Sequence, residues 1–138
     1  MMSEIVDRLL AVWTNPPEDQ AMLEEELRAL YTDPLTLNGV AQPLSELVAF
    51  ALRTAGAFSD QSTEILQVHQ TADILTFAFI RRGRHTGTYA SSLGPIEATG
   101  RTFELRVIDL LTLEDGRIAG GWAIPDELSL LRQLGAVG

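Results

Sequence analysis

The sequence contains no cysteine and only two histidines among its 138 residues. Without thiols, disulfides, thiolate nucleophiles and thiolate metal sites are excluded. His69 and His85 each lack a second histidine at helical or strand spacing, although paired histidines are common in transition-metal sites. We therefore expect no metal centre.

Long apolar runs and positive charge are also scarce. No stretch approaches the roughly 20 apolar residues of a membrane-spanning helix, and Glu4, Asp7 and Arg8 interrupt the region where a signal peptide needs an apolar run. The formal net charge of −9 repels phosphate backbones and anionic lipids. We expect a soluble, cytoplasmic protein that binds neither nucleic acid nor membranes.

What is present is the composition of an ordinary globular protein. Hydrophobic residues make up 46% and charged residues 21% of the chain, which argues against a disordered or membrane protein. The length suits one hydrophobic core. We expect a single domain that spans residues 1–138.

The first third of the chain has helical periodicity. Apolar residues recur at helical spacing over residues 3–13, 18–30 and 43–54. The run Asn15-Pro16-Pro17 separates the first two helices. Residues 31–39 favour a short strand that ends in a turn.

The remainder favours strands. Residues 62–70, 74–82, 102–113 and 117–124 are rich in β-favouring side chains, and a short Leu-rich helix follows the last run. Three N-terminal helices before a curled antiparallel sheet predict an α+β fold. We expect the helices on the concave face of a cone-shaped barrel with an open-ended cavity.

Asp115-Gly116 is a strong hairpin signal between the last two strands. A two-residue turn there pairs Leu113 with Ile118 and Asp109 with Trp122. Asp109 is then a carboxylate on an otherwise apolar sheet face, beside Trp122.

Asp126 follows Pro125 where the last strand meets the Leu-rich helix. Its carboxylate could cap the helix by accepting hydrogen bonds from the first N–H groups. It could instead lie half-buried against Trp122, where burial would raise its pKa into a working range. The residues alone leave both interpretations open.

Five short motifs occur in an order that resembles one family: Gly83-Arg84-His85-Thr86-Gly87, Thr99-Gly100-Arg101, Ile108-Asp109 leading into Asp115-Gly116-Arg117-Ile118, Trp122-Ala123-Ile124-Pro125-Asp126, and Gln133-Leu134-Gly135. The chain resembles the SnoaL-like proteins, which share the cone-shaped fold of nuclear transport factor two with ketosteroid isomerases and limonene epoxide hydrolase. The resemblance covers about three quarters of the sequence.

This resemblance implies a polyketide cyclase that needs no cofactor and acts on a hydrophobic small molecule. It implies that Asp126 is the general acid/base of an aldol-type ring closure or isomerisation. His85 matches a histidine of the family's pocket wall and is the second catalytic candidate, although an imidazole in a glycine-flanked turn could simply bind the backbone.

Further side chains are candidates for substrate contact: Trp122, Asp109, Tyr31, Tyr89 and Phe79. A developing enolate needs a hydrogen-bond donor, which His85, Tyr31 or Tyr89 could supply. Phe79 is also expected in the core by its strand pattern.

Two other functions remain open. Asp109 and Asp126 on adjacent strands could act together on an epoxide, with Arg101 or Arg106 completing an Asp-Arg-Asp set. Alternation, however, places Arg106 on the face opposite Asp109.

The protein could also hold an apolar molecule without catalysis. In either case Ile108 and Leu110, on the outer sheet face, lead us to expect a homodimer.

Overall fold

The computed structural model describes residues 3–138. Met1 and Met2, the first residues of the expected domain, lie outside the described residues. The helices are α1 (Glu4–Thr14), α2 (Gln20–Leu30), α3 (Leu44–Ala57) and α4 (Glu127–Gln133), and the strands are β1 (Tyr31–Leu37), β2 (Val40–Gln42), β3 (Phe58–Gln70), β4 (Ile74–His85), β5 (Tyr89–Ser91), β6 (Gly94–Ile96), β7 (Thr102–Glu114) and β8 (Arg117–Pro125).

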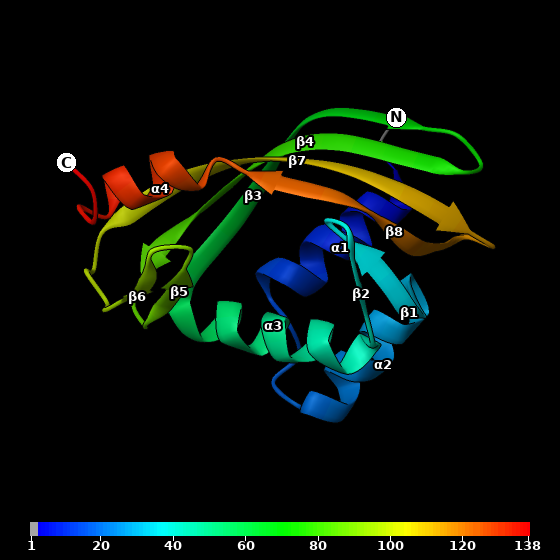
Figure 1. The fold of residues 1–138 in the computed structure, drawn as a ribbon, viewed down its shortest axis with the longest axis horizontal. Helices are drawn as coiled ribbons and strands as arrows, with labels where there is room; N and C mark the ends of the chain where they lie inside the picture. Colours follow the sequence, from blue (N-terminus) through cyan, green and yellow to red (C-terminus); the bar gives the residue numbers. More distant parts are fainter. Residues whose placement is uncertain (1–2) are drawn as a thin grey trace.

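Six strands form one curved sheet in the order β2-β1-β8-β7-β4-β3. Helices α1 to α3 lie on its concave side, and α4 lies at one end of the sheet (Figure 1). The expected α+β fold is confirmed. The sheet is mixed rather than wholly antiparallel, because β1 runs parallel to β8. Within residues 3–138, no helix is both long enough and apolar enough to cross a membrane.

Helix α2 shows how an amphipathic stripe and a capping residue define a helix. On α2, Leu23, Leu27 and Leu30 make one buried stripe, as the helical period of 3.6 residues requires. The Asp19 carboxylate accepts a hydrogen bond from the Ala21 N–H at 2.9 Å, which satisfies one of the free donors at the start of α2.

The buried apolar residues form two clusters. The larger fills the space between α1–α3 and the sheet and includes Phe77, Phe79 and Leu111. The smaller lies at the end of the sheet that α4 covers; its members are Ala57, Phe58, Phe103, Leu105, Leu130 and Leu134. Val107 packs against both clusters.

The hairpin between β7 and β8 starts in the expected register and then departs from it. Leu113 pairs with Ile118, as the Asp115-Gly116 turn predicts. The register then shifts between Thr112 and Leu113. Beyond that shift every expected partner is displaced by one residue.

The expected pairing of Asp109 with Trp122 is therefore wrong. Asp109 pairs with Ala123, and Leu110 pairs with Trp122. A one-residue shift moves each following side chain of β8 to the other face of the sheet. Trp122 consequently lies on the outer face and is 52% exposed.

Candidate active site

Asp109 carries the only acidic side chain of β7 that points to the concave face, opposite Phe77 of β4. Burial raises the pKa of this carboxyl from its ordinary 3.8 to about 7, although the nearby charge of Arg81 opposes the rise. Its Oδ1 atom is buried and has no hydrogen-bond partner among residues 3–138. A carboxyl that titrates near neutral pH can both take and return a proton.

Arg81 is the cation beside Asp109, and sequence reasoning missed it. The Arg81 Nη2 atom donates to the Trp13 carbonyl at the end of α1, at 3.4 Å. Burial lowers the pKa of Arg81, and the Asp109 charge opposes that effect. Its Nε atom has no partner in the described chain. Successive side chains of a strand point to opposite faces, so the pattern along β4 puts Phe77, Phe79 and Arg81 on one face. That pattern could have identified Arg81 from the sequence.

Tyr31 brings a buried hydroxyl to the same region. The Trp13 Nε1–H donates to the Tyr31 hydroxyl oxygen at 3.0 Å, so the hydrogen of that hydroxyl stays free for another acceptor. Burial raises the pKa of Tyr31, and the charge of Asp109 adds to the rise. Tyr31 is thus a protonated donor close enough to sense Asp109.

Two more polar groups border this region at the end of α1. The Gln61 Nε2 atom donates to the Thr14 carbonyl at 3.2 Å. The Gln61 Oε1 and Thr14 Oγ1 atoms are buried without a partner in residues 3–138. Buried polar atoms usually find partners, so this cluster suits a polar ligand atom or water.

Phe79 lies beside the cluster on the concave face. It is buried, and its ring stacks on Phe77 with 5.4 Å between the centroids. The expected core position of Phe79 is confirmed. Its contact with a substrate stays a prediction.

The structure places His85 far along β4 from Asp109. Phe77, the partner of Asp109, precedes His85 by eight residues, which is about 26 Å of strand at about 3.3 Å per residue. Strand curvature shortens the direct distance. His85 is fully buried and its ring centroid is 5.9 Å from that of Phe58, so it belongs with the smaller cluster.

The half-buried setting expected for Asp126 is wrong. Asp126 is exposed, and its Oδ1 atom accepts a hydrogen bond from the Ser129 N–H at 3.2 Å. This is the N-cap geometry of α4. Trp122, expected to bury it, points outward because of the register shift. Asp126 and Asp109 therefore do not form the acid pair expected for epoxide opening.

The Tyr89 hydroxyl is hydrogen-bonded to α4 and not to Asp109. Its hydroxyl donates to Glu127 Oε2 at 2.6 Å, and burial followed by this contact raises the pKa of Tyr89. Arg101 and Arg106 are both exposed, so neither fills the arginine role of the epoxide scheme. Arg81 is the arginine that faces the interior.

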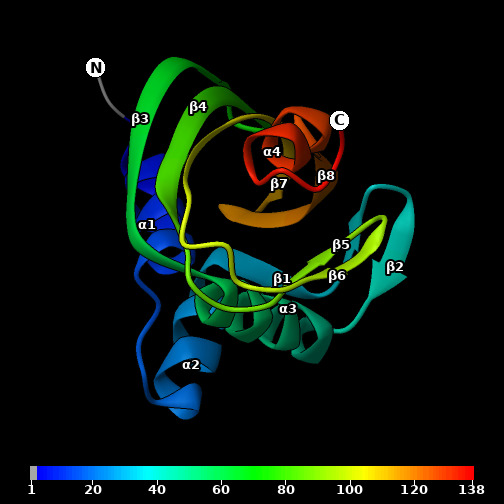
Figure 2. The same cartoon turned by 90° about the vertical axis from the view of Figure 1, so that its left-hand side faces the viewer.

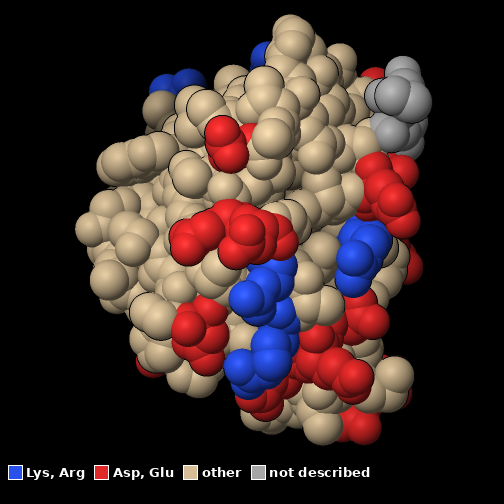
Figure 3. Space-filling view, turned by 90° about the vertical axis from the view of Figure 1, so that its right-hand side faces the viewer, with Lys and Arg blue, Asp and Glu red and all other residues tan. Residues whose placement is uncertain are grey.

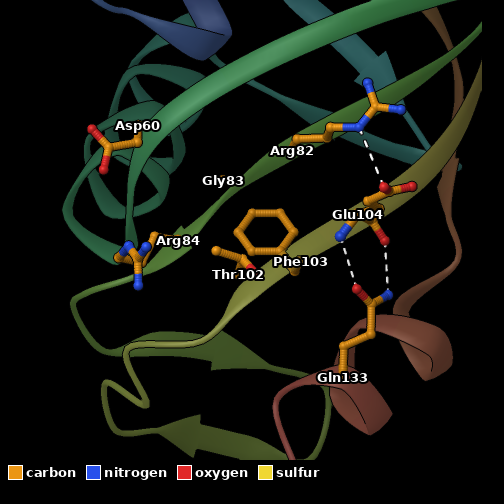
Figure 4. A pocket seen from close by; sticks show the side chains of 8 residues that line it. All are labelled: Asp60, Arg82, Gly83, Arg84, Thr102, Phe103, Glu104 and Gln133. Carbon is orange, nitrogen blue, oxygen red and sulfur yellow. Dashed lines mark hydrogen bonds and ion pairs between the residues drawn. The ribbon is translucent and has the colours of Figure 1, made fainter.

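A surface hollow of about 360 Å³ lies between β4, β7 and α4. Figure 4 shows Gln133 facing the Glu104 backbone, with Arg82 reaching Glu104 from the neighbouring strand. Gln133 exchanges two hydrogen bonds of 2.8 Å with that backbone, and Arg82 pairs with Glu64 and Glu104. These polar and charged groups serve as one another's hydrogen-bond and ion-pair partners. The bonds from Gln133 hold α4 against the sheet. A second hollow, of about 380 Å³, lies beside α1.

Together, the fold and the buried cluster define a cone-shaped α+β protein with a buried carboxyl group on the inner sheet face. The sequence model of the family described as SnoaL-like polyketide cyclase matches residues 3–134. The chain therefore belongs to the SnoaL-like polyketide cyclase family.

Solved structures agree on the fold. TsrD from Streptomyces laurentii is 23% identical, with 99% of this chain and 100% of that chain covered and a TM-score of 0.81. IdmH from Streptomyces antibioticus is 22% identical, with 96% and 99% covered and a TM-score of 0.72. A SnoaL-like polyketide cyclase from Agrobacterium tumefaciens is 20% identical, with 97% and 100% covered and a TM-score of 0.73. The chain matches no curated protein.

Proposed function

We propose that this protein is a cofactor-independent, cyclase-like enzyme that performs acid/base chemistry on a hydrophobic carbonyl compound. Asp109 is the general acid/base. One observation carries the proposal: its carboxyl lies on the apolar concave face, where burial raises its pKa to about 7. A base is most effective when its pKa is near the working pH.

The proposed reaction is an intramolecular aldol addition. The Asp109 carboxylate removes a proton from a carbon next to a carbonyl, and the resulting enolate oxygen accepts hydrogen bonds from Tyr31 and Arg81. The enolate carbon then bonds to a second carbonyl carbon of the same molecule, whose π electrons move to its oxygen. That alkoxide takes the proton back from Asp109. The ring closes without an oxidant or reductant.

Electrostatic arguments support the roles of Tyr31 and Arg81. Tyr31 is buried and Arg81 is half-buried, and both sense the charge of Asp109. In surroundings of low dielectric, such donors stabilise developing negative charge strongly, by about 3–4 kcal/mol for a single donor in other enzymes. The hydroxyl hydrogen of Tyr31 and the buried Nε–H of Arg81 are both donors not used within the described chain.

Asp126 is the residue to which the family resemblance assigns acid/base catalysis. Its exposed N-cap position favours Asp109 for that role, because a hydrophobic substrate binds at the apolar inner face and not at the solvent-exposed start of α4. The catalytic role of Asp126 stays a prediction, and it is tested beside Asp109.

The test measures proton removal directly, as hydrogen–deuterium exchange of the hydrogens next to the carbonyl of 1-tetralone in D2O, followed by NMR. We expect the protein to accelerate exchange. Asp109→Asn should reduce the acceleration by about 10²–10⁴, the usual contribution of a general base. Asp126→Asn, which keeps a good capping side chain, should stay within about twofold. The opposite pattern would assign the base to Asp126.

One observation supports the epoxide-opening alternative: Arg81 lies on the same sheet face as Asp109. The second carboxylate of an Asp-Arg-Asp set is not supplied by Asp126, as described above. Hydrolysis of styrene oxide to its diol by the protein, lost in Asp109→Asn, would favour this alternative. Tight binding of 1-tetralone without exchange or hydrolysis would instead favour a binding module.

A further inference from the structure

The Thr99-Gly100-Arg101 motif forms a turn that is hydrogen-bonded to the backbone of His85. The His85 N–H donates to the Arg101 carbonyl, and the Gly100 N–H donates to the His85 carbonyl, both at 2.8 Å. Gly100 adopts a φ of +71°, a conformation that glycine enters without steric cost. The motif therefore holds residue 99 at a fixed position beside the imidazole.

Thr99 presents two groups to one ring nitrogen. Its backbone N–H lies 3.2 Å from His85 Nδ1, and its Oγ1 atom lies 3.0 Å from the same nitrogen. The Oγ1 atom accepts from the Arg101 N–H at 3.3 Å, which leaves its own hydrogen available for Nδ1. A backbone N–H can only donate, so Nδ1 must offer its lone pair.

The neutral ring therefore carries its hydrogen on Nε2, because the hydrogen bond at one ring nitrogen sets the state of the other. His85 Nε2 is buried and has no partner in residues 3–138. The Phe58 ring, a member of the smaller apolar cluster, lies beside the imidazole. A buried N–H donor without an acceptor is unfavourable, which points to an acceptor atom that arrives with a ligand.

We infer that His85 donates a hydrogen bond from Nε2 to a carbonyl-type oxygen of the ligand, and that Thr99 is the positioning residue that fixes this tautomer. The inference rests on the proposed function, since the ligand is the same hydrophobic carbonyl compound. His85 is then an anchor rather than a base.

The position of His85 adds a property of the substrate. Asp109 and His85 are separated by most of the length of β4, so they cannot act on one atom. A substrate that uses both is elongated, with a reacting carbonyl near Asp109 and a second oxygen beneath α4.

The tautomer is tested first by long-range ¹H–¹⁵N NMR of the imidazole rings. We expect protonated Nε2 and unprotonated Nδ1 for His85, whereas the exposed His69 serves as the internal reference. Thr99→Val removes the hydroxyl and should shift the Nδ1 resonance of His85, while Thr99→Ser should restore it. A hydrogen on Nδ1 in the unaltered protein would overturn the inference.

The anchor is tested with two elongated probes that differ in one oxygen, the diketone 6-(8-oxononyl)-1-tetralone and the monoketone 6-nonyl-1-tetralone. Both carry the tetralone carbonyl for the Asp109 end, and only the diketone carries a second, distal oxygen. Asn at position 85 offers an oxygen to the Thr99 N–H but no distal donor, whereas Gln can place an N–H near the Nε2 position. The ratio of the two dissociation constants, diketone over monoketone, should rise about fivefold in His85→Asn, the loss of one neutral hydrogen bond. In His85→Gln it should stay within about twofold.

An unchanged ratio in His85→Asn, or an Nε2 resonance of His85 that does not move when the diketone is added, would overturn the anchor. Binding requires no proton transfer, so this result is separable from the proposed function. Loss of exchange in Asp109→Asn together with an unchanged ratio in His85→Asn would keep the acid/base proposal and reject the anchor. The reverse pattern would keep the anchor alone.

Discussion

Burial of Asp109 couples the stability of this protein to pH. The pKa of its carboxyl is about 7 in the folded chain, against an ordinary value of 3.8, so the folded state holds the proton more tightly than the unfolded state. The resulting stability is complete below about pH 4 and is lost as the pH rises through about 7. At about 1.4 kcal/mol per pH unit, the upper limit of the effect is about 4 kcal/mol.

We therefore expect Asp109→Asn to gain stability relative to the unaltered protein as the pH rises. The difference in free energy of unfolding, from denaturant titrations, should grow between pH 4 and pH 8 by up to about 4 kcal/mol. Asp7→Asn, on the exposed side of α1, is the control. A difference that stays flat over this range would contradict the buried, near-neutral carboxyl.

Single residues of the site were predictable only where strand alternation was regular. The pattern along β7 correctly put Asp109 on an apolar face, and the same pattern along β4 would have found Arg81. It failed for Trp122 and Asp126, because a register shift in β8 leaves no clear mark in the side-chain pattern. Gly120 and Gly121 are the only sign of this register shift in the sequence of β8.

At the scale of one element, the register shift in β8 changes which of its side chains face the site. Gly121 has a φ of +139°, and a Cβ atom there would overlap the carbonyl of Leu110 on β7. A Cβ at the neighbouring Gly120 would lie 2.6 Å from the Thr36 carbonyl oxygen. Only glycine permits this close approach of three strands.

We expect Gly121→Ala to lower the free energy of unfolding by about 1–3 kcal/mol, the range for backbone strain at one residue. Gly56→Ala is the matched control. Gly56 lies in α3 and has open space where a Cβ would be placed, so alanine should stabilise the helix by about 0.5–1 kcal/mol. Denaturant unfolding of both variants checks the prediction, and an unchanged Gly121→Ala protein would contradict the close backbone approach at Gly121.

The β5–β6 hairpin is fastened to α4 at the end of the cone. In the end-on view of Figure 2, both elements lie at the end of the curled sheet that faces the viewer. Glu127 accepts hydrogen bonds from the Tyr89 hydroxyl and from the Ser92 side chain. The Tyr89 ring packs on Phe58, with 5.3 Å between centroids, and Phe58 packs in turn against His85. The hairpin is thus linked to His85 through the Tyr89 and Phe58 rings.

We expect Glu127→Ala to release this hairpin without unfolding the sheet. Amide hydrogen exchange over residues 89–96 should accelerate at least about fivefold, since loss of one hydrogen bond is worth about 1 kcal/mol. The bonds from Ser92 and Tyr89 lower the pKa of Glu127, so the fastening should also weaken as the pH falls through that lowered pKa. Glu25→Ala on α2 is the control. Equal protection in both variants would argue against the fastening.

At the scale of the whole molecule, the order and type of the elements were predictable because the apolar periods are long and regular. The α1, α2 and α3 stripes and the four long strands fall within a few residues of their expected bounds. The parallel pairing of β1 with β8 was not predictable, because it depends on contacts between segments about 87 residues apart. The short β5–β6 hairpin lacks a periodic pattern altogether.

Charge is unevenly distributed over the surface. On the face seen in Figure 3, acidic and basic side chains gather in the lower part and few are present above it. Among the exposed charges of the molecule, Arg28 pairs with Glu24 at 2.7 Å and with Asp33 at 3.5 Å. Exposed pairs of this kind contribute little to stability, but they keep the surface around them solvated.

The outer face of β7 and β8 has the opposite character. Ile108 pairs with Ile124 and Leu110 with Trp122, and these four side chains are 45–58% exposed. Contiguous apolar side chains on a surface commonly mark an interaction site. None of the four is charged, so a second copy can approach this patch without bringing like charges together, despite the net charge of −9.

We propose that two copies pair through this patch. Light scattering at micromolar concentration should give twice the 15.1 kDa monomer mass. Ile108→Glu and Ile124→Glu should each give the monomer, because two-fold symmetry places every introduced charge near its own copy. Leu93→Glu, at the exposed turn between β5 and β6, should stay dimeric. A monomeric mass for the unaltered protein, or dimers that survive both substitutions, would rule out this interface.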